Sequence, residues 1–102
     1  MNAFSIVGKI TDMPMLKETS NGLKTCELPI QVQRNFPNSE GVYESDDVVV
    51  EVWRGLAETV SASCKIGDYV GINGRIHSRK YQKDDRVYLN YGFVAEKVDF
   101  LR

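Results

Sequence analysis

The chain has few of the residues that metal sites and covalent catalysis use. Its 102 residues include two cysteines and one histidine. Cys26 and Cys64 lack metal-site spacing, and Cys26 falls on the apolar side of an expected strand, as a buried free thiol in a reducing compartment would. His77 has no second histidine or cysteine at ligand spacing, so a surface or interface position is favoured over a zinc ligand. We therefore expect no metal and no cofactor.

Long apolar runs are also absent. No run approaches the length of a membrane span, and the N-terminus lacks the basic and then apolar pattern of a signal peptide. The sequence therefore predicts a cytoplasmic protein that does not bind membranes. It contains no repeats, low-complexity tracts or linkers, so we expect one domain over residues 1–102. Gly67, Gly71 and Gly74 lack the G-K-[ST] of a phosphate-binding loop, and we expect them to relieve crowding in a curved strand.

An excess of positive charge is missing as well, but the charges are segregated along the chain. The net charge is −1, which argues mildly against a nucleic-acid partner. Between Glu40 and Glu51 every charged residue is acidic, whereas between Lys65 and Arg86 six basic residues accompany three aspartates. A local positive surface is therefore expected on a nearly neutral molecule.

The clearest pattern runs from Lys65 to Tyr91. Val70, Ile72 and Ile76 alternate with polar and aromatic residues, which predicts a strand with one apolar and one basic face. After a turn at residues 82–85 the alternation resumes, with an apolar side formed by Val87, Leu89, Tyr91, Phe93 and Ala95. The tip of this predicted hairpin carries Arg79, Lys80, Tyr81, Lys83, Arg86 and Tyr88. Cations pair with phosphates and flat rings accept unstacked bases, so the tip fits a single nucleic-acid strand.

Apolar spacing elsewhere predicts three more strands and one helix. The strands are expected at Asn2–Ile10, Leu23–Arg34 and Asp47–Trp53, and the helix at Gly55–Cys64. Pro29 cannot donate a ladder hydrogen bond, so it marks an edge or a bulge. Five curved strands with a short helix between the third and fourth predict an all-β, five-stranded Greek-key barrel of the oligonucleotide-binding type, the OB-fold. A simple β-sandwich is the alternative.

Several segments resemble the DNA-binding core of bacterial single-stranded DNA-binding proteins (SSB). They are N-A-F-S-I-V-G-K-I, S-N-G, V-E-V-W-R-G-L-A-E, K-I-G-D-Y-V-G-I-N-G-R-I-H-S-R-K-Y and A-E-K-V-D-F-L, which cover nearly the whole chain in the family's order. The resemblance implies an OB-fold that forms a homotetramer and wraps single-stranded DNA around its outside. It also implies that Phe36, Trp53 and Tyr81 stack on bases.

Two departures from the family pattern qualify this resemblance. Asp46 and Asp47 stand where the family often has an aromatic residue near the start of the third strand. Cellular members continue into a glycine-rich linker and an acidic tip that recruits replication and repair enzymes, whereas this sequence stops at Arg102. The alternatives are a longer native protein and a tailless phage, plasmid or accessory form.

Four aromatic residues are candidate stacking platforms: Trp53, Phe36, Tyr81 and Tyr88. For three of them a structural role is the alternative, because Trp53 can brace the barrel, Phe36 can plug its end and Tyr88 can form a cross-strand pair. The candidate phosphate contacts are Arg34, Arg54, Arg75, Arg79, Lys80, Lys83 and Arg86. Each one alone is more often a solvated charge, and their clustering is what predicts salt-dependent binding.

The sequence thus predicts a non-enzymatic, nucleoid-associated protein that binds single-stranded DNA without sequence preference in replication, recombination and repair. Its expected partners are single-stranded DNA and further copies of itself, as a homotetramer or a dimer, with replication or repair proteins if a tail exists. One alternative is an accessory protein of a primosome or helicase complex that acts through protein contacts. Another is a nuclease with a magnesium ion on Asp46 and Asp47, which the lack of a third carboxylate or positioned base disfavours.

Overall fold

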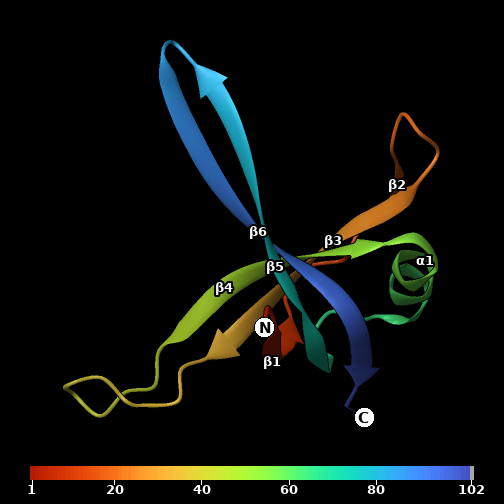
Figure 1. The fold of residues 1–102 in the computed structure, drawn as a ribbon. Helices are drawn as coiled ribbons and strands as arrows, with labels where there is room; N and C mark the ends of the chain where they lie inside the picture. The colour runs from red at the N-terminus through yellow and green to blue at the C-terminus, as the bar shows by residue number, and fades with distance from the viewer. Residues whose placement is uncertain (102) are drawn as a thin grey trace.

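The fold is known from a computed structural model that describes residues 1–101 (Figure 1). Within these residues it has six strands and one helix. In chain order they are β1 (Phe4–Ile10), β2 (Lys17–Glu18), β3 (Lys24–Gln33), β4 (Ser45–Trp53), α1 (Arg54–Ser63), β5 (Tyr69–Lys83) and β6 (Arg86–Phe100). No helix in the described part is long and apolar enough to cross a membrane.

The strands form one sheet that closes into a ring. Neighbours follow the order β1-β5-β6-β4-β3-β2, and β1 also pairs with β3. Two short seams complete the ring: Lys9 and Ile10 join β1 to β3, and Val50 and Glu51 join β4 to β6 in parallel. The predicted five-stranded Greek-key OB-fold is confirmed, with its helix between the third and fourth long strands. The two-residue strand β2 pairs with the start of β3.

The core lies inside the ring, because each strand turns its alternate apolar residues inward. Leu28, Val50, Val52, Val70 and Ile72 are at most 1% exposed. Burial of each such side chain contributes about 1.5–3 kcal/mol. The alternation of β4 thus turns Val50 and Val52 into the core.

Helix α1 covers one end of this core and begins one residue earlier than predicted. Its Ala57 and Val60 are fully buried against the ring. Cys26 and Cys64 are free, buried thiols, and burial raises the pKa of both. The predicted burial of the free Cys26 thiol is therefore confirmed.

Pro29 lies where β3 has a strand partner on one side only. It is paired with Val49 of β4, and its carbonyl accepts a hydrogen bond from the Thr11 N–H at 3.2 Å. The N and O of one residue in an antiparallel strand point the same way, so the missing N–H faces away from β4. On that side of β3, the pairing with β2 extends only as far as Thr25, and the pairing with β1 begins at Ile30. The predicted edge position is confirmed.

Gly67 lies just before β5, and its role differs from those of Gly71 and Gly74 within the strand. Gly74 lies at a register shift in β5, and a Cβ there would overlap the Val94 carbonyl of β6. Crowding therefore requires glycine at this position. Gly67 instead has a φ of 94° in a turn, and a Cβ on Gly71 would meet open space. The prediction that all three relieve crowding is correct only for Gly74.

Beyond the ring, β5 and β6 continue together as a projecting hairpin, residues 77–91, which we call the finger (Figure 1). Its tip is a two-residue turn in which Asp84 and Asp85 have φ values of 51° and 65°. Such a turn matches the twist of paired strands. Val87 and Tyr91 are 68% and 69% exposed, so the apolar side that the sequence predicted is not buried along the finger.

Cross-strand register assigns the finger side chains to two faces, because directly paired residues share a face. On one face, Arg79, Tyr81 and Lys83 of β5 oppose Asn90, Tyr88 and Arg86 of β6. We call this the cationic face. On the other, Ser78, Lys80 and Gln82 oppose Tyr91, Leu89 and Val87. Lys80 therefore lies on the apolar side, away from the other predicted basic contacts.

Candidate nucleic-acid interface

Trp53 lies at the junction of β4 and α1, on the outer surface of the ring. The alternation of β4 buries Val52 and leaves Trp53 half-buried on the same face as Glu51. Trp53 is extended, whereas Arg54 has a φ of 61°. A left-handed conformation is uncommon for a residue other than glycine, and it turns the chain sharply into the helix. This turn brings Trp53 and Arg54 to the rim of the same groove.

That groove combines a flat ring with several cationic groups. It has a volume of about 310 Å³, and we call it the arginine groove. Its lining residues are Leu23, Trp53, Arg54, Arg75, His77, Arg79 and Val94. Three of these are arginines that the sequence predicted as phosphate contacts. A half-buried indole beside three guanidinium groups offers stacking and phosphate binding within one groove.

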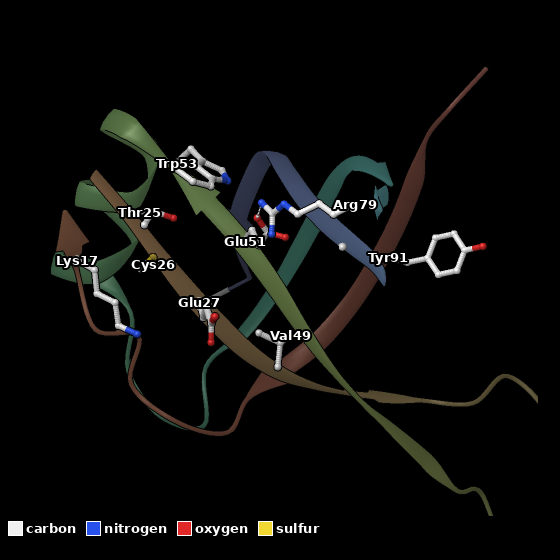
Figure 2. Close-up of a pocket in the computed structure, with 10 residues that line it drawn as sticks. Lys17, Thr25, Cys26, Glu27, Val49, Glu51, Trp53, Arg79 and Tyr91 are labelled. Atoms are coloured by element: carbon white, nitrogen blue, oxygen red, sulfur yellow. Dashed lines mark hydrogen bonds and ion pairs between the residues drawn. The ribbon is translucent and has the colours of Figure 1, made fainter. Parts of the chain in front are cut away.

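A second groove of about 380 Å³ also has Trp53 in its lining (Figure 2). It contains both acidic and basic groups, so we call it the mixed groove. Its lining includes Lys17, Glu27, Glu51, Trp53 and Arg79. Trp53 and Arg79 line both grooves, of which one is rich in arginine and the other includes carboxylates.

Glu51 joins the base of the finger to β4. Its carboxylate hydrogen-bonds the His77 Nε2 at 2.8 Å and accepts a bond from the Arg79 Nη2 at 3.3 Å. Gly92 is paired directly with His77, and a Cβ on Gly92 would overlap both the His77 and the Glu51 side chains. The space that Gly92 leaves is therefore required for this contact. His77, predicted at a surface or an interface, has a side chain that is 21% exposed and lines the arginine groove.

Tyr81 and Tyr88 form a single platform on the cationic face. Their rings are stacked, with centroids 5.1 Å apart and planes at 15°. The cross-strand pair that the sequence offered as an alternative role for Tyr88 is thus confirmed. Tyr81 remains 47% exposed and Tyr88 38%, so the stack has surface left for a base.

The connection between β3 and β4 projects from the ring together with the first two residues of β4; we call this second arm, residues 34–46, the β3–β4 arm (Figure 1). Its Arg34 bonds both carboxylate oxygens of Asp46, at 2.9–3.2 Å, and a Glu44 oxygen at 3.1 Å. The hydrogen bond from Arg34 lowers the pKa of Asp46. Phe36 is 81% exposed, so it does not plug the end of the barrel.

This pairing also bears on the magnesium alternative. Asp46 is already engaged by Arg34. Within residues 1–101 no group of three histidine, cysteine, aspartate or glutamate side chains is placed to hold a metal ion. The structure therefore offers no support for a nuclease centre on Asp46 and Asp47.

Most of the predicted site residues fall into two places. Trp53, Arg54, Arg75 and Arg79 line the arginine groove, while the cationic face carries Tyr81, Tyr88, Lys83 and Arg86. Arg34, Phe36 and Lys80 lie elsewhere. Sequence reasoning missed Glu51 and Gly92 as parts of the site. The alternation placed Glu51 beside Trp53, but its contact with His77 depends on the pairing of β4 with β6.

Comparison with known proteins identifies the family. The model of the Single-strand binding protein family matches residues 1–101. The chain belongs to this family. Single-stranded DNA-binding protein 3 of Listeria innocua is 38% identical over 99% of this chain and 64% of its own length. Single-stranded DNA-binding protein B of Bacillus subtilis is 36% identical over 98% of this chain and 89% of its own.

The fold is also that of a solved family structure. The single-stranded DNA-binding protein of Thermus aquaticus superposes with a TM-score of 0.86 and 23% identity, over all of this chain and 50% of that one. The chain spans between 59% and 64% of the length of relatives from Listeria innocua, Bacillus cereus and Bacillus anthracis. The names of these relatives describe DNA binding, so they do not favour the accessory-protein alternative.

Proposed function

We propose that this chain binds single-stranded DNA, with bases stacked on exposed aromatic rings and phosphates held by arginine and lysine side chains. The observation that carries the proposal is the arginine groove. There the Trp53 indole lies beside Arg54, Arg75 and Arg79 in a space of about 310 Å³. Every base has a face to stack, so such a surface accepts many sequences.

The path of the strand continues from this groove onto the finger. Arg79 lines the groove and also lies on the cationic face, next to the stacked Tyr81 and Tyr88. Lys83 and Arg86 extend that face to the tip. We propose that the strand runs from Trp53 along this face, with the tyrosine stack as a second platform. Phe36, on the other arm, is a further candidate platform.

Arg34 and Lys80 are left out of the proposed contacts. The Arg34 guanidinium is already paired with Asp46 and Glu44, so a phosphate would have to displace them. Lys80 lies on the opposite face of the finger from Arg79. The proposed phosphate contacts are therefore Arg54, Arg75, Arg79, Lys83 and Arg86.

Assembly into a homotetramer, with a dimer as the alternative, is part of the proposal. Strand β1 pairs with β5 along residues 4–9 but with β3 only at Lys9 and Ile10. Its other edge is thus open over most of its length, and Val7 is 56% exposed. An open edge can pair with a strand of another copy. Several linked grooves would add avidity along one DNA strand.

A role in replication, recombination and repair follows from the proposal, because these processes expose single strands. So does a place in the cytoplasm, at the nucleoid. The proposed protein protects the exposed strand and catalyses no reaction.

Tryptophan fluorescence tests the proposal, since Trp53 is the only tryptophan. We expect oligo-dT to quench it and a duplex of equal length to leave it unchanged, at low and at moderate salt. The variant Trp53→Phe has no indole fluorescence, so anisotropy of labelled DNA measures its binding. We expect the binding to persist, because phenylalanine also has a ring on which a base can stack. If no binding of single strands is found by either method, the proposal is wrong.

A further inference from the structure

Two acidic side chains line the mixed groove beside Trp53, and the structure fixes one of them. Glu51 precedes Trp53 by two residues on the outer face of β4, and Glu27 of β3 is its direct cross-strand partner. The Glu51 side chain is 19% exposed and is held by His77 and Arg79. Glu27 is exposed. Glu51 is therefore an acceptor with a defined orientation next to the indole.

The surroundings of Glu51 reduce its repulsion of DNA without using all of its hydrogen-bonding capacity. The Arg79 guanidinium, 3.3 Å away, offsets its negative charge. A carboxylate has about four lone-pair sites, and the bonds with His77 and Arg79 account for two. The others can accept hydrogen bonds from a ligand.

The spacing of Glu51 and Trp53 matches the size of a nucleobase. Residues two apart on a strand are separated by about 7 Å along it. In Figure 2 the Arg79 guanidinium reaches Glu51 beside Trp53, within the lining of the mixed groove. A base stacked on the indole and directed into this groove would bring its hydrogen-bonding edge near Glu51, which lines the same groove.

We propose that the mixed groove is a base subsite in which Glu51 selects nucleobases with an exocyclic amino group, cytosine above all, over thymine and uracil. The amino N–H of cytosine donates to a carboxylate. Thymine and uracil have a carbonyl oxygen at that position, which would leave two acceptors facing each other without a donor. This inference rests on the proposed function and adds to it a base preference that stacking alone does not give.

Binding of oligo-dC and oligo-dU of equal length to the whole chain tests the preference. Cytosine and uracil differ in the amino or carbonyl group at ring position 4 and in the adjacent ring proton. In mildly alkaline buffer, where cytosine is neutral, we expect oligo-dC to bind at least about fivefold more tightly. Equal binding, or tighter binding of oligo-dU, would overturn the preference alone. If neither strand binds, the proposed function fails and the inference with it.

Glu51→Gln and its matched control Glu27→Gln assign the preference to a residue. Both variants remove one negative charge from the same groove, so both should strengthen binding of either strand. Only Glu51→Gln should bring the ratio of the two affinities close to one, because an amide can donate to a carbonyl as well as accept from an amino group. An unchanged ratio in Glu51→Gln, or an equal loss in Glu27→Gln, would contradict the assignment. The wild-type ratio is a test that does not depend on either variant folding.

Discussion

The finger and the β3–β4 arm both project from the ring, but they differ in charge and in how their basic residues are paired (Figure 1). The β3–β4 arm has one basic residue, Arg34, and three acidic ones, and two of these bind it. The finger has four basic residues and two aspartates, which lie at its turn. The two projecting arms therefore differ in how many unpaired basic side chains they have for a phosphate. The comparison favours the finger as the proposed DNA-binding arm, because it has more basic residues and most of them are not held by a carboxylate pair as Arg34 is.

The largest effect is expected from removing the cations of the finger. Arg79→Ala, Lys83→Ala and Arg86→Ala together should weaken binding of oligo-dT about a hundredfold, at about 1 kcal/mol per contact. The slope of log affinity against log salt should fall by about 2. Fluorescence titrations at several salt concentrations measure both quantities.

Arg34→Ala, on the other arm, is the control, and we expect less than about a twofold loss because exposed, already paired charges contribute little. A larger loss from Arg34→Ala than from the triple variant would reverse the comparison of the two arms.

Aromatic substitutions come next in size. Tyr81→Ala should cost about tenfold in affinity, because it removes a stacking surface and the partner of Tyr88. Tyr81→Phe keeps the ring and should bind nearly as well. Phe36→Ala makes the same change on the β3–β4 arm, where we expect a smaller loss. Anisotropy of labelled oligo-dT measures all three, and a greater loss for Phe36→Ala would move the main platform to that arm.

Releasing Arg34 should make the two arms more alike. Asp46→Asn removes the carboxylate that binds Arg34 through both oxygens, so only Glu44 still competes with a phosphate for the guanidinium. We expect a gain of about threefold in affinity and a salt slope steeper by about 0.7. The gain should vanish in the double variant Arg34→Ala, Asp46→Asn. A gain that persists there would mean that the loss of negative charge, and not Arg34, strengthens binding.

The smallest expected effect is on stability. The bond from Arg34 lowers the pKa of Asp46 in the folded state, so it stabilises the fold at pH values above the ordinary aspartate pKa. That contribution is lost as the pH falls through the lowered value. Asp46→Asn should therefore melt slightly below the wild type at neutral pH and together with it in strong acid. Thermal unfolding across this range checks the sign, and a difference that grew with acidity would contradict it.

The sequence predicted most of the fold, because the ring depends on alternating side chains. The inward valines of β4 and the outward Trp53 follow from a period of two. The pattern did not show that the apolar side of the finger, including Val87 and Tyr91, projects beyond the core, since alternation does not reveal where burial ends.

The predicted site rested on residue types and their clustering in the sequence. Contacts between residues that are distant in the sequence change which of these residues we assign to it. The sequence proposed both Arg34 and Arg79 as phosphate contacts. Only the structure shows that Arg34 bonds two carboxylates, Asp46 and Glu44, whereas Arg79 has a single 3.3 Å contact with Glu51 and lines both grooves. The bond between Glu51 and His77 joins residues 26 positions apart. No local pattern predicts it.

Photocrosslinking of the whole chain to oligo-dT that contains 5-iododeoxyuridine tests the central claim most directly. This base couples to an aromatic side chain on which it is stacked, and mass spectrometry of the digested complex identifies that residue. We predict crosslinks at Trp53 and at Tyr81 or Tyr88, with fewer at Phe36. Crosslinks confined to Phe36 and Tyr43 of the β3–β4 arm would contradict the account and place the DNA on the arm whose arginine is already paired.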